Sequence, residues 1–142
     1  HDYCIALYDV DKFKNFNDTQ GHLAGDRVLC AVADALGSGG RSGDAVYRYG
    51  GEEFVVVLPA QSLETAATVA ERIREAVLSL GIPHPACGAG AVVTVSGGVA
   101  RLEQSDAGNF EAVLKRADAA LYRAKELGRN RVDISDLASI PG

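Results

Sequence analysis

The sequence predicts an α/β domain of the α+β kind, with a mixed central β-sheet, a ferredoxin-like, palm-type βαββαβ core and helices packed on both faces. Apolar β-branched runs alternate with segments of helical periodicity, which requires crossover connections and parallel strands. Two of these runs are instead separated by a Gly-Gly pair, which predicts one central antiparallel hairpin. A length of 142 residues with 47% hydrophobic content fits one domain with a buried core.

The first half of the chain predicts one strand, two helical segments and the hairpin. An apolar run at 3–8 predicts the first strand, and mixed apolar and polar residues at 12–17 predict a short helical turn or loop. Apolar side chains at helical spacing predict a helix over 23–37 that a glycine ends, followed by a glycine-rich connector. The β-rich runs at 46–49 and 52–58 predict the hairpin strands, joined by a two-residue primed turn.

The second half of the chain predicts two long helices, each followed by a strand. Ser62 and Asn109 are suitable N-caps for these helices, and Gly81 and Gly128 end them. The expected inner faces are Ala66, Ala70, Ile73, Val77 and Leu80 in the first helix and Phe110, Val113, Leu114, Ala117, Leu121 and Ala124 in the second. The remaining segments are a loop at 82–90, a strand at 92–100 and a last strand at 131–134.

Acidic residues stand at two predicted strand ends. Glu52 and Glu53 open the second hairpin strand and, because side chains alternate, we expect them on opposite faces, one in a shared site and the other tuning it. Asp9 and Asp11 end the first strand and share a face. If these strand ends are neighbours, the converging carboxylates repel one another, and a divalent cation such as Mg²⁺ or Mn²⁺ is the expected occupant. The alternative is a solvated turn whose charges keep an edge strand from pairing.

The bulk properties exclude several classes of function. A net charge of −5 argues against a broad surface for nucleic acid or anionic membrane, and we expect this domain to contact neither. No apolar run is long enough to span a bilayer and no signal peptide is present, so we expect a piece of a longer protein, anchored to a membrane, if at all, through other domains. Three cysteines without CxxC spacing predict a reducing cytoplasm, and scattered histidines predict no zinc site.

Six blocks of sequence resemble the GGDEF family, the bacterial diguanylate cyclases. The signature is Gly50-Gly51-Glu52-Glu53-Phe54, in its GGEEF form. The other blocks are Asp9 to Lys14, Asn17-Asp18, Gly21-His22 with Gly25-Asp26, Ser96 with Gly98-Val99-Ala100, and Ala117-Asp118 continuing to Asn130. The resemblance implies a GGDEF catalytic domain at 1–134, without the family's usual upstream segment, and a C-terminal tail at 135–142. Gly97 stands where the family usually has a larger apolar residue, which predicts a small loss of packing.

The resemblance implies metal-assisted phosphoryl transfer, in which two GTP molecules condense into cyclic di-GMP and two pyrophosphates. A homodimer is implied, because each GTP-loaded domain must meet a second one. The implied metals are two Mg²⁺ or Mn²⁺ ions per active site, held by Asp9, Glu52 and the Val10 carbonyl. Glu53 is implied to be needed for activity, with the roles of second metal ligand and base both open, and Lys14 completes the catalytic set.

The resemblance also implies nucleotide-binding positions. Asn17 and Asp26 match the residues that bind guanine, since a carboxylate accepts from guanine N1–H and its amino group while an amide both donates and accepts. Backbone N–H groups at Lys12 and Phe13 would contact the β- and γ-phosphates, and Lys14, Lys125 and Arg129 would add positive charge. The structural alternatives are a helix first-turn acid at Asp26, a turn residue at Asn17 and helix C-terminal cations at Lys125 and Arg129.

An RxxD tetrad, Arg41-Ser42-Gly43-Asp44, precedes the signature by the spacing found in family members that cyclic di-GMP inhibits. Arg41 could bind a phosphate while Asp44 accepts from guanine, and Arg72 matches a position that adds a further arginine contact. The alternative is a solvated turn.

Two rival functions remain open for the whole domain: a catalytically silent module that senses GTP or cyclic di-GMP, and a related palm-type cyclase or polymerase. The absence of a basic stripe for a template disfavours the polymerase.

Overall fold

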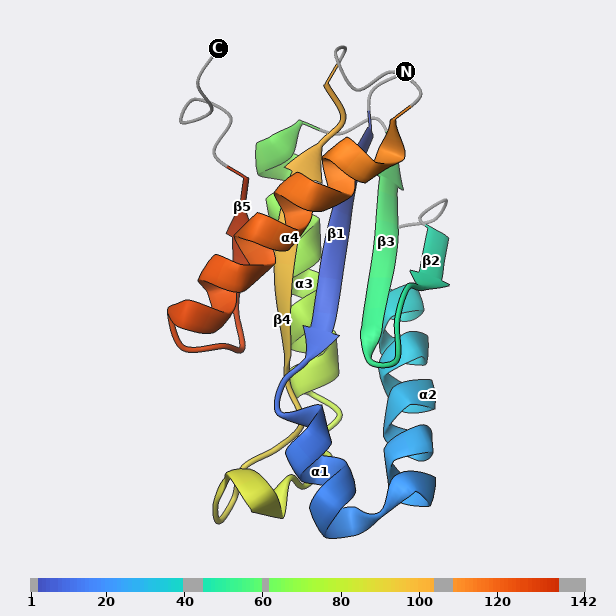
Figure 1. The fold of residues 1–142 in the computed structure, drawn as a ribbon, viewed down its shortest axis with the longest axis vertical. Helices are drawn as coiled ribbons and strands as arrows, with labels where there is room; N and C mark the ends of the chain where they lie inside the picture. The colour runs from blue at the N-terminus through green and yellow to red at the C-terminus, as the bar shows by residue number, and fades with distance from the viewer. Residues whose placement is uncertain (1–2, 40–44, 60–61, 104–108, 136–142) are drawn as a thin grey trace.

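The computed structural model describes residues 3–39, 45–59, 62–103 and 109–135, which form a five-stranded sheet flanked by helices (Figure 1). The elements in chain order are β1 (Tyr3–Val10), α1 (Phe13–Gln20), α2 (His22–Gly39), β2 (Ala45–Arg48), β3 (Glu53–Pro59), α3 (Leu63–Leu78), the 3-10 helix η1 (Pro85–Cys87), β4 (Val95–Arg101), α4 (Phe110–Glu126) and β5 (Val132–Ile134). Among these residues, no helix is long and apolar enough to span a bilayer.

The sheet has the strand order β2-β3-β1-β4-β5. β1 lies in the centre and pairs antiparallel with both β3 and β4, while β2 pairs antiparallel with β3. The crossovers through α1 and α2 and through α3 therefore each connect parallel strands that have an antiparallel strand between them, which is the split βαβ arrangement. β4 and β5, connected through α4, are parallel neighbours. The predicted mixed sheet with a ferredoxin-like core is confirmed.

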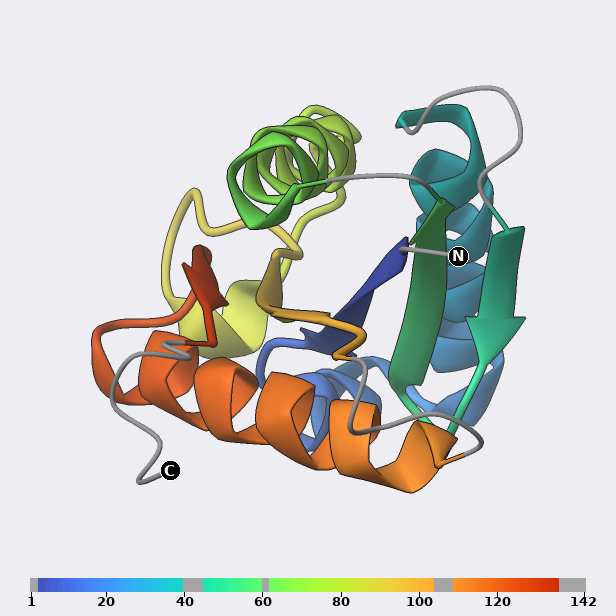
Figure 2. The same ribbon diagram turned by 90° about the horizontal axis from the view of Figure 1, so that it is seen from above.

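Helices cover both faces of the sheet (Figure 2), because the central strand is apolar on both sides. Cys4, Ala6 and Tyr8 of β1 belong to the larger core cluster, which α2 and α3 close on one face. Ile5 and Leu7 belong to the second cluster, which α4 closes on the opposite face. All five side chains are at most 2% exposed, so β1 is the most deeply embedded part of the domain and holds its C-terminal residues in fixed positions.

Several predicted boundaries are wrong. Residues 13–17, predicted as part of a short helical turn or loop, lie in the regular helix α1, which continues to Gln20. α2 continues past Gly37, which does not take the left-handed φ that a glycine C-cap needs. β4 begins only at Val95, since Val92 forms an isolated bridge with Pro83. The 37–43 connector falls partly on residues outside those described.

The caps and inner faces of the two long helices are largely as predicted. The side chains of Ser62 and Asn109 accept hydrogen bonds from the backbone N–H groups of Thr65 and Ala112, at 3.1 and 3.3 Å. The exceptions are Leu80, which follows the end of α3 and is 42% exposed, and Phe110 in the first turn of α4, which is 40% exposed. Leu80 lies beyond the last turn of α3 and Phe110 is the first residue of α4, so helical spacing alone does not bury them.

The packing loss expected at Gly97 does not occur, because Tyr8 on the neighbouring strand fills the space. A Cβ atom at Gly97 would lie 2.8 Å from Cε1 of the Tyr8 ring. Tyr8 is fully buried, and its hydroxyl donates a 2.7 Å hydrogen bond to the carbonyl of Ala70 in α3. The glycine and the tyrosine on β4 and β1 are therefore complementary in size.

Candidate active site

The C-terminal end of β1 and the β2–β3 turn lie at the same end of the sheet, next to α1 (Figure 1). Asp9 is directly opposite Glu53 in the antiparallel pairing of β1 and β3. The backbone N–H of Val10 donates a 3.2 Å hydrogen bond to the carbonyl of Glu52. The two acidic strand ends are therefore neighbours, as the sequence predicts.

The hairpin turn differs from the prediction. The Tyr49 N–H donates to the Glu53 carbonyl at 2.8 Å, so the turn contains three residues, Gly50, Gly51 and Glu52. Neither glycine has the left-handed φ of a primed turn. The Arg48 side chain supports this wider turn by donating to the carbonyls of Gly50 at 3.2 Å and Gly51 at 2.6 Å.

This turn changes the relation between the two signature glutamates. Because β3 begins at Glu53, Glu52 lies in the turn, and strand alternation does not separate the two side chains. Both carboxylates interact electrostatically with Asp9 and with Lys125, from the last turn of α4. The prediction that both glutamates open the strand is therefore wrong, and the charge of Asp9 acts on both carboxylates, which we call, together with Asp9, the acidic cluster.

The acidic cluster resists ionisation. Burial, followed by the charge of the nearby Asp9 carboxylate, raises the pKa of Glu52 from 4.5 to about 7. Burial and the charges of Asp9 and Asp118 raise the pKa of Glu53 as well. Lys125 opposes both shifts, and its ammonium forms an ion pair with Oδ2 of Asp9, a residue that is only 6% exposed.

The cluster fits a divalent cation. Oδ1 of Asp9 is buried and has no hydrogen-bond partner, which is costly unless another group coordinates it. The partly buried Glu52 carboxylate beside it supplies a second hard oxygen ligand. Within the described part of the chain, no three His, Cys, Asp or Glu side chains are arranged to hold a metal. The metal ligands predicted from the sequence include only two such side chains, Asp9 and Glu52. The third predicted ligand is the backbone carbonyl of Val10.

β1 passes into α1 through an unusual turn. Lys12 has left-handed backbone angles of φ 55° and ψ 35°, and no side chain caps the helix that it begins. The ring of Phe13 is buried and stacked with that of Phe16, with centroids 6.3 Å apart, so only the backbone of Phe13 is available to a ligand. Lys14 is exposed, and its Nζ atom lies 3.5 Å from Oδ2 of Asp18.

Asn17 and Asp26 are brought together where α1 meets α2. The Asn17 side chain lies against Gly25, where an added Cβ atom would be 1.8 Å from Oδ1 of Asn17. This oxygen is buried without a hydrogen-bond partner. Asp26 follows Gly25 directly and is exposed. The close approach of the two helices, which only glycine permits, therefore places an amide oxygen without a hydrogen-bond partner against the residue that precedes the exposed Asp26.

A buried carboxylate fixes the segment that carries Arg129. Asp11 accepts hydrogen bonds from the Thr94 hydroxyl at 2.7 Å, the Ser96 hydroxyl at 2.6 Å and the Asn130 N–H at 3.0 Å. Arg129 and Asn130 both have left-handed φ values, 63° and 48°. Asp11 thus joins the end of β1 to the turn after α4, and both of its carboxylate oxygens accept hydrogen bonds in doing so.

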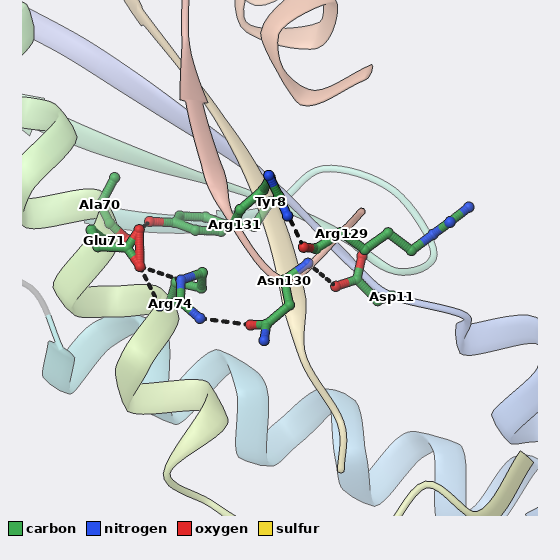
Figure 3. Close-up of polar contacts among 8 residues, drawn as sticks. All are labelled: Tyr8, Asp11, Ala70, Glu71, Arg74, Arg129, Asn130 and Arg131. Atoms are coloured by element: carbon green, nitrogen blue, oxygen red, sulfur yellow. Dashed lines mark hydrogen bonds and ion pairs between the residues drawn. The ribbon is translucent and has the colours of Figure 1, made fainter. Parts of the chain in front are cut away.

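Figure 3 shows that this connection extends to α3, since the Asn130 side chain accepts a 2.6 Å hydrogen bond from Arg74, which also pairs with Glu71. The sequence spacing did not predict this role for Asp11, although Ser96 and Asn130 both lie in the blocks that resemble the family. Neither Thr94 nor Arg74 of α3 belongs to a sequence motif that would have indicated this role.

The RxxD residues Arg41 and Asp44 lie outside the described residues, while Arg72 is exposed on α3. Next to the acidic cluster, a cavity of about 460 Å³ opens between the hairpin and α4, with Glu53, Tyr49, Leu114 and Asp118 in its lining.

The comparisons with known proteins agree with this geometry. Residues 1–131 match the family model described as "Diguanylate cyclase, GGDEF domain". Diguanylate cyclase DgcM of Escherichia coli K12 is 48% identical over 134 residues, which cover 92% of this chain. The chain spans only 30% of the length of that relative.

Solved structures show the same fold. The GGDEF domain of DgcB from Caulobacter crescentus, in complex with c-di-GMP, is 39% identical, with a TM-score of 0.82 over 94% of this chain and 78% of the other. The active GGEEF domain of a diguanylate cyclase from Vibrio cholerae is 35% identical, with a TM-score of 0.80 over 96% of this chain and 84% of the other.

Proposed function

Because this chain belongs to the GGDEF family of diguanylate cyclases, we propose that it condenses two GTP molecules into cyclic di-GMP and releases two pyrophosphates. The observation that carries the proposal is the convergence of Asp9, Glu52 and Glu53 around Lys125, with a buried Asp9 oxygen left without a partner. The similarity to an active GGEEF domain supports the proposal, because this chain has the same form of the signature.

The metals are two Mg²⁺ or Mn²⁺ ions per site, held by Oδ1 of Asp9, the Glu52 carboxylate and the Val10 carbonyl. When bound, such ions neutralise phosphate charge and make a hydroxyl easier to deprotonate. Glu53 serves as a further ligand or as the base for the 3′-hydroxyl. The raised pKa of Glu53, caused by burial and the charges of Asp9 and Asp118, makes its carboxylate a stronger base than that of an ordinary glutamate.

The triphosphate binds between α1 and the end of α4. Backbone N–H groups at Lys12 and Phe13 contact the β- and γ-phosphates, because the first N–H groups of a helix have no partners within it. Lys14, Lys125 and Arg129 supply positive charge. For Lys125 this requires exchanging its partner, Asp9, for a phosphate oxygen.

Guanine binds to Asn17 and Asp26. The unpaired Asn17 oxygen and the Asp26 carboxylate both accept, which matches the N1–H and amino donors of guanine and rejects the adenine edge. Two such domains face each other in a homodimer. Each 3′-oxygen then forms a bond to the α-phosphorus of the opposite GTP as the bond to the β-phosphate oxygen breaks, and pyrophosphate leaves.

Product inhibition through the RxxD tetrad is part of the proposal. Arg41 binds a phosphate or guanine of cyclic di-GMP, Asp44 accepts from guanine, and Arg72 adds a contact from α3. Titrating cyclic di-GMP into the parent and into Arg41→Ala tests this site. Equal binding by the two proteins would remove the tetrad from the proposal.

We place the catalytic domain at 1–134 and a tail at 135–142, in the cytoplasm, where GTP is available.

The test is to incubate the chain with Mg²⁺ and GTP and to separate the products by chromatography. We expect cyclic di-GMP from GTP, no cyclic dinucleotide from ATP, and a loss of orders of magnitude in Glu52→Gln. Binding of GTP without any product would instead support a silent sensing module.

A further inference from the structure

A buried histidine lies beneath the turn that begins α1. His84 is 1% exposed, and its Nε2 atom lies 3.1 Å from the carbonyl oxygen of Lys12. Because a carbonyl can only accept, Nε2 must carry the proton and donate to it. The same carbonyl accepts the N–H of Phe16 at 3.1 Å, so both of its lone pairs are used.

The ring of His84 is held in place from several sides. It packs edge-on against Phe16, with centroids 5.3 Å apart and planes at 85°. Its backbone N–H donates to the Ala91 carbonyl at 2.8 Å, and its own carbonyl accepts from the Cys87 N–H at 2.9 Å. A residue fixed in this way positions the atoms that it contacts, and the contact here is with Lys12.

The other ring nitrogen shows that this contact has a cost. With Nε2 donating, Nδ1 is an acceptor, and it is buried with no hydrogen-bond partner. A phenylalanine or leucine would fill the same space without leaving a buried polar atom unsatisfied. Packing alone therefore does not account for a histidine, whereas a donor to the Lys12 carbonyl does.

Lys12 needs such support because its left-handed conformation is uncommon for a residue with a side chain. The peptide that carries the Lys12 carbonyl also carries the Phe13 N–H, at its other end. Fixing the carbonyl from beneath therefore fixes the direction in which this N–H points. The proposed function assigns that N–H to the β- and γ-phosphates of GTP.

We propose that His84 is a positioning residue for the triphosphate, acting through the Lys12 turn without touching the substrate. This inference rests on the proposed function. It predicts that His84 contributes to binding of the distal phosphates and not to binding of guanine, because the Lys12 carbonyl accepts from His84 and Phe16, whereas the Asn17 side chain lies against Gly25 of α2.

The test compares two ligands by calorimetry in the presence of Mg²⁺: GMP, and a GTP analogue with a methylene group between the α- and β-phosphorus atoms. His84→Phe keeps a buried ring but removes the donor. We expect it to weaken binding of the analogue about tenfold and to leave GMP binding unchanged, which is the size of effect typical of one lost hydrogen bond. His84→Gln, which places an amide N–H near the position of Nε2, should restore most of the affinity.

Val77→Ala is the matched control, because it destabilises the core on α3 without contacting Lys12. The inference is overturned if His84→Phe binds the analogue as the parent does, if it loses both ligands equally, or if Val77→Ala shows the same selective loss. A parent that binds neither ligand would overturn the proposed function itself, and this inference with it.

Discussion

Lys125 of α4 pairs with Oδ2 of Asp9 at the end of β1, and this contact places a single ammonium among three carboxylates. Lys125 lowers the pKa of both Glu52 and Glu53, against burial and the Asp9 charge, which raise it. The lysine therefore keeps the cluster closer to the ionised state that a metal requires.

Replacing Lys125 by methionine should raise the pKa of Glu52 above its value of about 7, because the opposing charge is lost. Affinity for GTP should fall as well, since the lysine is proposed to bind the triphosphate. Carbon-13 NMR of the glutamate side chains, recorded against pH, measures the first effect. Lys115→Met on the same helix is the control, and an unshifted Glu52 in Lys125→Met would contradict the prediction.

Glu52 makes the metal-free domain less stable at higher pH. The pKa of Glu52 is raised in the folded state, so the contribution of this residue to stability is fully present below pH 4.5 and is lost as the pH rises through about 7. Glu52→Gln cannot ionise and should therefore be more stable than the parent at pH 8, with a smaller difference at pH 5. Urea unfolding with a chelator at both pH values measures this, with Glu75→Gln on α3 as control. If the difference in the free energy of unfolding between Glu52→Gln and the parent does not change with pH, the prediction of a raised pKa for Glu52 is wrong.

The fold could be predicted because its signals are local. The first strand is apolar from Tyr3 to Tyr8, the helices α3 and α4 have clear N-caps, and the hairpin is marked by its glycines. The wrong boundaries have tertiary causes. The turn at Gly50 and Gly51 is widened by the Arg48 guanidinium, and the space at Gly97 is filled from β1 by Tyr8. No property of the local sequence reports which side chain a neighbouring strand supplies.

The acidic cluster could be predicted from strand ends, but its division of roles could not. The spacing of Asp9 and Asp11 predicts a shared face, yet both carboxylate oxygens of Asp11 accept hydrogen bonds from Thr94, Ser96 and the Asn130 N–H. These partners are more than 80 residues away in the sequence, as is shown by separations of 83, 85 and 119. His84 is missed for the same reason, since its partner Lys12 is 72 residues away.

Gly25→Ala should disrupt guanine binding without touching the ligand. The new Cβ atom would lie 1.8 Å from Oδ1 of Asn17, so the amide must move away from its position beside Asp26. Losing one hydrogen bond to the base should cost roughly 1–3 kcal/mol of binding free energy. Calorimetry with GTP measures the loss.

Gly37→Ala is the matched control, because it also replaces a glycine within α2 but meets no atom within 4 Å. It should keep the parental affinity and increase the free energy of unfolding by roughly 0.5–1 kcal/mol, since alanine favours a helix over glycine. Equal GTP affinity in Gly25→Ala and Gly37→Ala would show that Asn17 does not contact guanine.

Asp11→Asn distinguishes a structural carboxylate from a metal ligand. The asparagine amide group presents a donor to one of three hydrogen-bond donors, which leaves buried groups unpaired and should lower the free energy of unfolding by roughly 1–3 kcal/mol. The turn that carries Arg129 should loosen, so affinity for GTP should fall. Affinity for Mn²⁺ alone should stay at the parental value, because Asp9 and Glu52 are unchanged. Asp9→Asn provides the contrast, since it should lose Mn²⁺ binding, which electron paramagnetic resonance of the free ion measures directly. A folded Asp11→Asn protein that loses Mn²⁺ as Asp9→Asn does would make Asp11 a ligand and overturn its structural assignment.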